Sequence, residues 1–216
     1  MAHDYEVRSS KQAFNGKIIK VRTDQVTMPG GNESQRDVVI HPGAVGIVAL
    51  DDQGRVMLIK QYRHPVKESL WELPAGLMDV EGELALTTAQ RELGEEAGLQ
   101  ADTWNVLVDV LTSPGMTNEA TRIYLARNVS DTGDERSDED EEAELELAWV
   151  DLDEALRSVL SGGIRNALAV AGILAAAHAR DRKFENLREE QAPWPDRFSR
   201  VPQLVDRKGA ETPPLG

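Results

Sequence analysis

The sequence contains no cysteine among its 216 residues. It therefore offers neither a disulfide framework nor a thiol nucleophile. Basic residues are also scarce: 24 lysines and arginines stand against 38 aspartates and glutamates, which gives a formal net charge of −14. A nucleic-acid-binding surface needs a surplus of basic side chains to displace counterions from phosphates. Without that surplus, we expect no nucleic-acid partner.

Long hydrophobic runs are absent as well. The most apolar stretch, 167–177, is too short to cross a bilayer, which takes about 20 residues, and its alanines are typical of a packed helix. The first six residues have neither the basic start nor the apolar run of a secretory signal. These features predict a soluble cytoplasmic protein without membrane association. An apolar content of 40% is sufficient for a buried core.

A dense group of carboxylates is present at Glu92, Glu95 and Glu96. Residues three and four apart share one face of a helix, so Glu92 lies beside the other two. Like charges at this spacing repel each other, and a hard divalent cation such as Mg²⁺ would remove that cost. Leu93 continues an apolar stripe, and Gly98 is placed as a C-terminal helix cap. The alternative interpretation is an acidic helix face that is merely solvated.

These residues belong to a longer pattern with fixed spacing. Residues 91–99 read Arg-Glu-Leu-Gly-Glu-Glu-Ala-Gly-Leu, and seven residues separate Arg91 from Glu83. The pattern resembles the Nudix box, G-x5-E-x7-R-E-U-x-E-E-x-G-U, in which U is an apolar residue. One position departs from it, because six residues rather than five separate Gly76 from Glu83. A one-residue insertion in the preceding loop explains the difference, and Glu81 is the alternative upstream carboxylate.

The order of local signals predicts an α+β fold with an N-terminal appendage. Strands are expected at 44–50, 55–62, 104–111, 121–126 and 144–150, and helices at 83–97, 151–160 and 164–180. The first two of these strands flank a turn at 51–54 and are expected to pair as a hairpin. Helices flanking a mixed sheet form an α+β sandwich, which agrees with the α/β/α arrangement that the Nudix resemblance implies. We expect a small β-rich segment at 1–41, a Nudix domain at 42–189 and a C-terminal tail at 190–216.

Four further segments resemble the ADP-ribose pyrophosphatase branch of this family, most strongly its actinobacterial members. They are Gln61–Pro65, Leu70–Gly76, Thr112–Gly115 and Gly162–Ala167. This resemblance implies Mg²⁺-dependent hydrolysis of the diphosphate of ADP-ribose to AMP and ribose 5-phosphate, with Mn²⁺ as an alternative metal. The box residues Glu92, Glu95 and Glu96 and the backbone carbonyl of Ala75 would hold two or three ions. Arg91 would pair with a box glutamate.

The resemblance also implies a general base in the loop before the last strand. Nine of the fourteen residues from Asp131 to Glu144 are acidic. Counting back from the strand selects Glu141, with Glu142 as the second candidate, and a solvated loop carboxylate is the alternative for either. Because so charged a loop repels itself, we expect it to become ordered with substrate and Mg²⁺.

Substrate contacts are expected outside the box. Arg63 is the best candidate for a phosphate or adenine contact, since its guanidinium is a planar fork of donors. Arg36 and Glu119 stand where family members contact substrate, although a strand-edge charge and a turn acid are equally good interpretations. Pro114 and Gly115 belong to the same expected substrate loop.

Three other conspicuous side chains are interpreted as structural. His41 and His64 each precede a proline and are expected to position loops rather than act as bases, and Trp71 is expected in the core.

The resemblance further implies a homodimer, because members of this branch usually exchange N-terminal segments that help to build the partner's adenine pocket. Two other functions stay open. One is a Nudix pyrophosphatase for ADP-sugars, NADH or oxidised nucleotides, and the other is a sensor that binds ADP-ribose without cleaving it. The complete set of box glutamates and the lack of a basic extension after Leu99 disfavour the sensor.

Overall fold

The computed structural model describes residues 5–133 and 145–194. The described chain forms two compact units. The first unit contains residues 5–43, 111–120 and 194, and the second contains residues 44–110 and 121–193. The box therefore lies entirely in the second unit. No helix within these described ranges is long and apolar enough to cross a membrane.

The first unit is built on a three-stranded antiparallel sheet. Its strands, in the order β1-β2-β3, are β1 (Val7–Asn15), β2 (Lys20–Thr27) and β3 (Glu33–Ile40). A tight turn joins β2 to β3, where Gly31 adopts a φ of 82° that favours glycine. This sheet confirms the β-rich appendage. Its strands are longer than the apolar segments of the sequence suggest, because most of their residues are not buried and carry no alternating apolar signal.

The second unit contains a five-stranded mixed sheet in the order β11-β8-β9-β4-β7. Strands β4 and β9 run parallel, whereas β7 is antiparallel to β4 and β11 is antiparallel to β8. The bounds of the strands are β4 (Ala44–Ala49), β7 (Ala75–Leu77), β8 (Leu99–Leu111), β9 (Ala120–Asp131) and β11 (Arg188–Glu189). All of β4 is buried, as expected of a central strand covered on both faces.

A second sheet in this unit has the order β10-β5-β6 and is antiparallel throughout. It is formed by β5 (Arg55–Arg63), β6 (Glu68–Glu72) and β10 (Glu146–Asp151). The predicted hairpin of β4 with β5 is wrong, since only one isolated bridge, Leu50 to Val56, joins them. The turn at 51–54 does form, but the two strands then separate into different sheets. Local turn chemistry specifies the reversal of the chain and not the partners of the strands beyond it.

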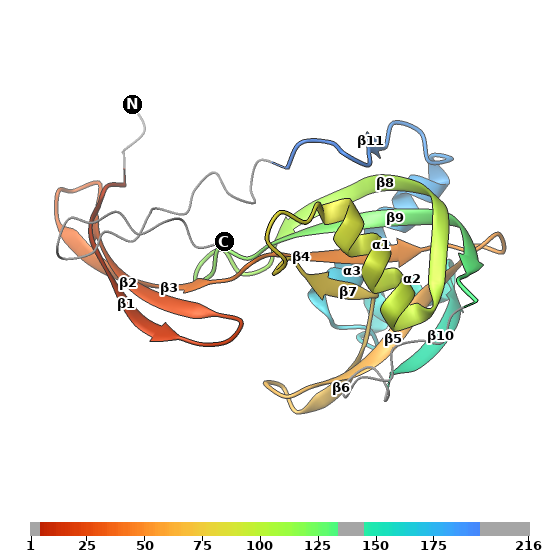
Figure 1. The fold of residues 1–216 in the computed structure, drawn as a ribbon, viewed down its shortest axis with the longest axis horizontal. Coiled ribbons are helices and arrows are strands. Elements are labelled where there is room, and N and C mark those ends of the chain that lie inside the picture. The colour runs from red at the N-terminus through yellow and green to blue at the C-terminus, as the bar shows by residue number, and fades with distance from the viewer. Residues whose placement is uncertain (1–4, 134–144, 195–216) are drawn as a thin grey trace. The chain divides into compact units, whose positions relative to one another are not determined.

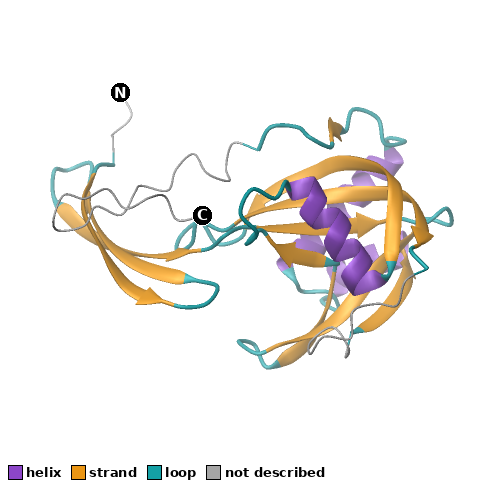
Figure 2. Ribbon diagram, viewed as in Figure 1, coloured by secondary structure: helices purple, strands orange, loops and turns teal. Residues whose placement is uncertain are grey.

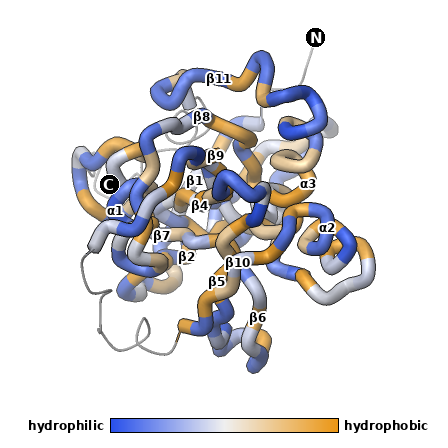
Figure 3. The backbone as a smooth tube through the Cα atoms, turned by 90° about the vertical axis from the view of Figure 1, so that its right-hand side faces the viewer, coloured by the Kyte–Doolittle hydropathy of each residue, from blue (hydrophilic) through white to orange (hydrophobic). Residues whose placement is uncertain are grey.

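The helices of the described chain are α1 (Ala85–Ala97), α2 (Leu152–Ser161) and α3 (Ala167–Asp181). Helices α1 and α3 cover the mixed sheet, and α2 packs against α3 and the second sheet. Figure 1 shows α1 in front of β4 and β7 with α3 behind them, and Figure 2 shows the same layers by type of structure. Helix α3 is largely apolar, as its colour in Figure 3 shows, and Gly172 packs it closely onto the sheet. These layers confirm the predicted α+β sandwich.

The helix ends follow the capping signals more closely than the apolar pattern. Asp151 caps α2 by accepting hydrogen bonds from the backbone N–H groups of Asp153 and Glu154. Asn166 caps α3 through the N–H of Ala169, so the helix begins three residues later than Ile164, where it was predicted to begin. Gly98 ends α1 with a φ of 67°, as predicted.

Candidate active site

Helix α1 packs an apolar stripe against the sheet, and two of its glutamates lie beside that stripe against strand β7. Ala89 and Leu93 are completely buried, and Ala97 is buried at the end of the same stripe. This packing fixes the rotation of the helix. The glutamates of the box are consequently directed toward the chain segment that enters β7, and α1 contacts β7 directly.

Glu96 is the buried carboxylate of the box, with 7% of its surface exposed. Its Oε2 accepts a hydrogen bond of 2.8 Å from the backbone N–H of Ala75. The structure thus brings together two of the four predicted metal-binding positions, although they are 21 residues apart in the sequence.

Glu92 approaches the same segment at Gly76. A Cβ added to Gly76 would lie 2.0 Å from both Cδ and Oε1 of Glu92. Any side chain at this position would therefore displace the Glu92 carboxylate. The glycine of the box is required here for close approach, a role that the sequence pattern alone did not identify.

Arg91 joins the remaining box carboxylates. Its guanidinium lies 2.6 Å from Glu95 and 2.9 Å from Glu92, and its Nε lies 3.4 Å from Glu83. Burial opposes its charge, but the hydrogen bond to Glu83 and the charges of Glu92 and Glu95 outweigh this effect and raise the pKa of Arg91. Arg91 compensates a cluster of carboxylates that would otherwise repel each other.

Glu83, rather than Glu81, is the upstream carboxylate that meets this cluster. Its Oε2 accepts a 2.8 Å hydrogen bond from the hydroxyl of Thr88, and this bond, together with Arg91, lowers the pKa of Glu83. Glu81 is exposed in the preceding loop.

The donor set fits a hard divalent cation, because carboxylate and backbone oxygens are the ligands that Mg²⁺ prefers. Within residues 5–133 and 145–194, no three acidic or histidine side chains are already gathered as a metal-binding group. Glu92 and Glu95 instead form ion pairs with Arg91. The observation that supports the fit is the contact of Glu96 and Glu92 with Ala75 and Gly76, which aligns carboxylates of α1 with the backbone that enters β7.

Arg63 forms a bidentate ion pair at the end of β5. Its Nε and Nη2 donate hydrogen bonds of 3.0 and 2.8 Å to the two carboxylate oxygens of Glu72. The Glu72 side chain is 3% exposed and that of Arg63 is 42% exposed. Arg63 is thus held by a buried partner that the sequence analysis missed.

Three of the predicted substrate residues lie around one loop of the first unit. The Oε2 of Glu119 accepts a 2.6 Å hydrogen bond from the Thr112 hydroxyl, and Gly115 lies in the turn from Ser113 to Met116 with open space around its Cα. Pro114 lies in the same turn.

His41 and Arg36 belong to the same unit. His41 Nδ1 lies 4.0 Å from Glu119 and accepts a hydrogen bond from the N–H of Gly43. Burial lowers the pKa of His41 even though Glu119 acts in the opposite direction. Arg36 is exposed on β3 and donates to the carbonyl of Gln35 at 2.8 Å.

The predicted bases Glu141 and Glu142 lie outside the described residues. The described chain before them is tied to the box helix, because the N–H of Thr132 donates a 2.9 Å hydrogen bond to the carbonyl of Gly98. After them, Leu145 is buried immediately before β10.

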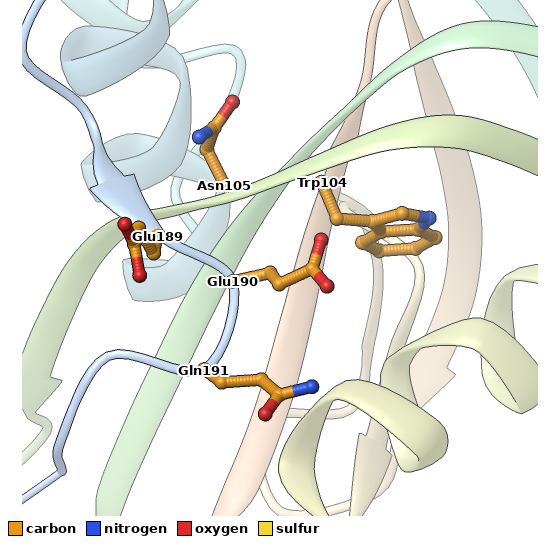
Figure 4. Close-up of a pocket in the computed structure, with 5 residues that line it drawn as sticks. All are labelled: Trp104, Asn105, Glu189, Glu190 and Gln191. Carbon is orange, nitrogen blue, oxygen red and sulfur yellow. The ribbon is translucent and has the colours of Figure 1, made fainter.

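The side chains interpreted as structural have structural contacts. The ring of Trp71 packs against the core with Lys60 Nζ 5.4 Å from its centroid, and His64 lies edge-on to Tyr62. A hollow of about 320 Å³ between β8 and the segment of β11 is lined by none of the predicted site residues. Figure 4 shows the Glu190 carboxylate turned toward Trp104 in this hollow.

Comparison with known proteins agrees with this geometry. Residues 40–169 match the NUDIX domain, and residues 5–39 match the nucleoside diphosphate sugar hydrolase N-terminal domain. The chain belongs to the Nudix hydrolase family, which generally uses divalent metals such as Mg²⁺.

Relatives of known name cover most of the chain. It is 48% identical to an ADP-ribose pyrophosphatase of Mycobacterium tuberculosis, over 90% of this chain and 93% of the relative. It is 34% identical to a methanol dehydrogenase activator of Bacillus methanolicus, over 76% and 88%. The crystal structure of an ADP compounds hydrolase superposes with a TM-score of 0.75, covering 85% of this chain and 97% of that one at 19% identity, which supports the fold.

Proposed function

We propose that this Nudix hydrolase cleaves the diphosphate of ADP-ribose to AMP and ribose 5-phosphate. The observation that carries the proposal is the contact of Glu96 and Glu92 with Ala75 and Gly76 across α1 and β7. The substrate assignment is supported by the relative of 48% identity, which is named an ADP-ribose pyrophosphatase.

Glu92, Glu95, Glu96 and the carbonyl of Ala75 would hold two or three Mg²⁺ ions, with Mn²⁺ as an alternative. Such ions, when bound, neutralise the charge of the diphosphate and make water more acidic. The chain itself supplies their placement. Ala75 N–H orients Glu96, and Arg91 keeps Glu92 and Glu95 from repelling each other.

The reaction adds water across one phosphorus–oxygen bond. The water oxygen bonds to phosphorus, the bridging bond to the second phosphate breaks, and one proton leaves the water. Glu141 is the proposed acceptor of that proton, with Glu142 as the second candidate, because both lie in the acidic run before the last strand, from which the family resemblance implies that the base comes. Such a base must lie about 3 Å from its proton donor.

The remaining polar residues would bind the substrate. Arg63 would contact a phosphate, with adenine as the alternative, and this role is supported by its fixation by Glu72 and by its partial exposure. Arg36, Glu119, Pro114 and Gly115 would contact the nucleoside part.

Product analysis with ADP-ribose tests the reaction. Wild type with Mg²⁺ should release AMP and ribose 5-phosphate, and chelation of the metal should stop the release. Glu96→Gln preserves the size of the side chain but removes the charge, and we expect a loss of at least 10²-fold in kcat. Absence of cleavage by wild type would redirect the assignment to ADP-sugars, NADH or oxidised nucleotides, or to a sensor.

We further propose a cytoplasmic homodimer in which residues 1–41 are exchanged between subunits. Light scattering should give twice the chain mass of 23.8 kDa. A monomer at micromolar concentration would refute the dimer.

A further inference from the structure

The C-terminal end of β5 carries the polar side chains of Gln61 and Arg63, which are not part of the Nudix box. Val56 and Leu58 face α2 and α3, because they belong to one core cluster with Leu152 and Ile173. Successive side chains of a strand point to opposite faces. The alternate side chains of β5 therefore face the other side, and α1 also contacts β5. Figure 1 shows α1 and α3 on opposite sides of the second unit.

Gln61 and Arg63 lie on this α1-facing side of β5. Glu72 pairs with Ile59 in the sheet, so its side chain lies on the same side, as its ion pair with Arg63 requires. The buried carboxylate and its two hydrogen bonds leave the guanidinium little freedom to turn. This end of β5 thus presents a cation of fixed orientation beside an uncharged amide.

The amide of Gln61 has an unused acceptor. Its Oε1 is buried, and no donor among the described residues reaches it. Buried acceptors are nearly always hydrogen-bonded in folded proteins, so a group from outside the protein is expected to supply the donor. Gln61 lies two residues before Arg63 on the same face, so the Cα atoms of the two residues are about 7 Å apart along the strand.

We propose that Gln61 is a specificity-determining residue whose Oε1 accepts a hydrogen bond from a ribose hydroxyl of the substrate. This inference rests on the proposed function, in which Arg63 contacts a phosphate. The ribose is the group joined directly to a phosphate, whereas the adenine lies one group further away. A hydroxyl of either ribose of ADP-ribose has the required chemistry.

The test measures KM and kcat for Gln61→Met, which keeps the length of the side chain but has no amide acceptor. We expect KM for ADP-ribose to rise about tenfold with kcat nearly unchanged, because the lost bond is present before and during the reaction. The matched control is Gln53→Met, a change at an exposed glutamine in the turn between β4 and β5, which should leave both constants unaltered. Thermal unfolding of both variants checks that each is folded.

Three substrate analogues identify the donor. Two of them lack the free hydroxyls of the adenosine ribose or of the terminal ribose, and the third carries inosine in place of adenosine. For wild type, kcat/KM with one deoxy analogue should be about tenfold lower than with ADP-ribose. For Gln61→Met, kcat/KM should be the same with that analogue as with ADP-ribose. The assignment would be overturned if each deoxy analogue lowered kcat/KM equally in wild type and in Gln61→Met. It would also be overturned if the difference in kcat/KM between wild type and Gln61→Met disappeared only with the inosine analogue.

The outcomes separate this inference from the proposed function. If wild type hydrolyses ADP-ribose and Gln61→Met has the same KM as wild type, only the role of Gln61 is overturned. Water would then donate the hydrogen bond to Oε1. Failure of wild type to hydrolyse ADP-ribose would overturn the proposed function and the ribose assignment with it.

Discussion

Close contacts of single residues decide how the box can work. The fixed glutamates of the pattern were predicted from the sequence, but their partners were not. Gly76 permits Glu92 to reach the backbone of β7, Ala75 orients Glu96, and Glu72 holds Arg63. Each of these contacts joins segments that lie apart in the chain, so no local pattern could specify them.

Replacement of Gly76 tests the close approach to Glu92. In Gly76→Ala, the new Cβ would lie 2.0 Å from the carboxylate, which must move. A displacement of about 1 Å in a catalytic group is enough for a loss of about 10²-fold in kcat. Steady-state kinetics with ADP-ribose gives the measurement.

Gly94→Ala is the matched control within α1. A Cβ there meets nothing closer than 3.9 Å, and alanine favours the helix, so this variant should gain about 0.5–1 kcal/mol in stability and keep its activity. Full activity of Gly76→Ala would show that the carboxylate position has no catalytic importance.

Glu83 gives the box a dependence on pH. Its hydrogen bonds from Thr88 and Arg91 lower its pKa below the ordinary value of 4.5. A carboxylate with a lowered pKa stabilises the fold above its unfolded-state pKa, and this contribution is lost as the pH falls through the folded-state value. Urea unfolding between pH 7 and pH 3 should therefore show a steeper loss of stability for wild type than for Glu83→Gln.

The difference should appear only below about pH 4.5, and Glu81→Gln, in the exposed part of the same loop, should behave like wild type. Parallel curves for wild type and Glu83→Gln would contradict the prediction.

At the scale of elements, capping residues and apolar stripes predicted the helices well. The sequence indicated the caps Asp151 and Gly98, whereas Asn166 was recognised as a cap only in the structure. All three act at helix ends because their side chains or backbone freedom satisfy groups within one turn, which is a local property. Strand partners were not predictable in the same way. The expected hairpin of β4 and β5 failed because each strand found better burial in a different sheet.

The packing of α3 on the sheet depends on Gly172. A Cβ at this position would lie 2.6 Å from Leu73 Cδ1 and 3.0 Å from Val48 Cγ2, and both residues are fully buried. We expect Gly172→Ala to destabilise the protein by about 1–3 kcal/mol, because overpacking outweighs the gain in helix propensity. Chemical denaturation measures the change.

Shortening the opposing side chain is the internal control for this prediction. The double variant Gly172→Ala/Leu73→Val should lose less than the sum of the two single changes, because the methyl group that clashes is removed. Additive losses would indicate that the two residues do not compete for the same space.

At the scale of the whole molecule, a buried arginine joins three distant parts of the chain. The Arg122 side chain on β9 is 3% exposed and donates to Asp109 at 2.8 Å and to the carbonyls of Ala192 and Pro193 at 2.6 and 3.0 Å. The start of the predicted tail is therefore anchored on the second unit. Arg188 adds a second bond to Asp109 at 2.6 Å.

Arg122→Met should release this anchor. Asp109 would keep only Arg188 as a charged partner, so we expect a loss of about 2–3 kcal/mol, less than for a completely unpaired buried charge. Hydrogen exchange of residues 188–193 should become faster while that of β4 stays slow. Arg188→Met, at a side chain that is 41% exposed, should have the smaller effect, and equal effects would contradict the central role of Arg122.

From the sequence alone follow the family, the layered α+β class, the C-terminal cap of α1 and the identity of the box carboxylates. These depend on spacings within one helix or one turn, where neighbours in sequence are neighbours in space. Only the tertiary structure decides which sheet each strand joins, why Gly76 carries no side chain, and that Glu72 and Gln61 lie on the same side as Arg63. Those properties depend on which strands pair and which faces they bury, so their free energies depend on burial and shape in the assembled fold and not on any local pattern.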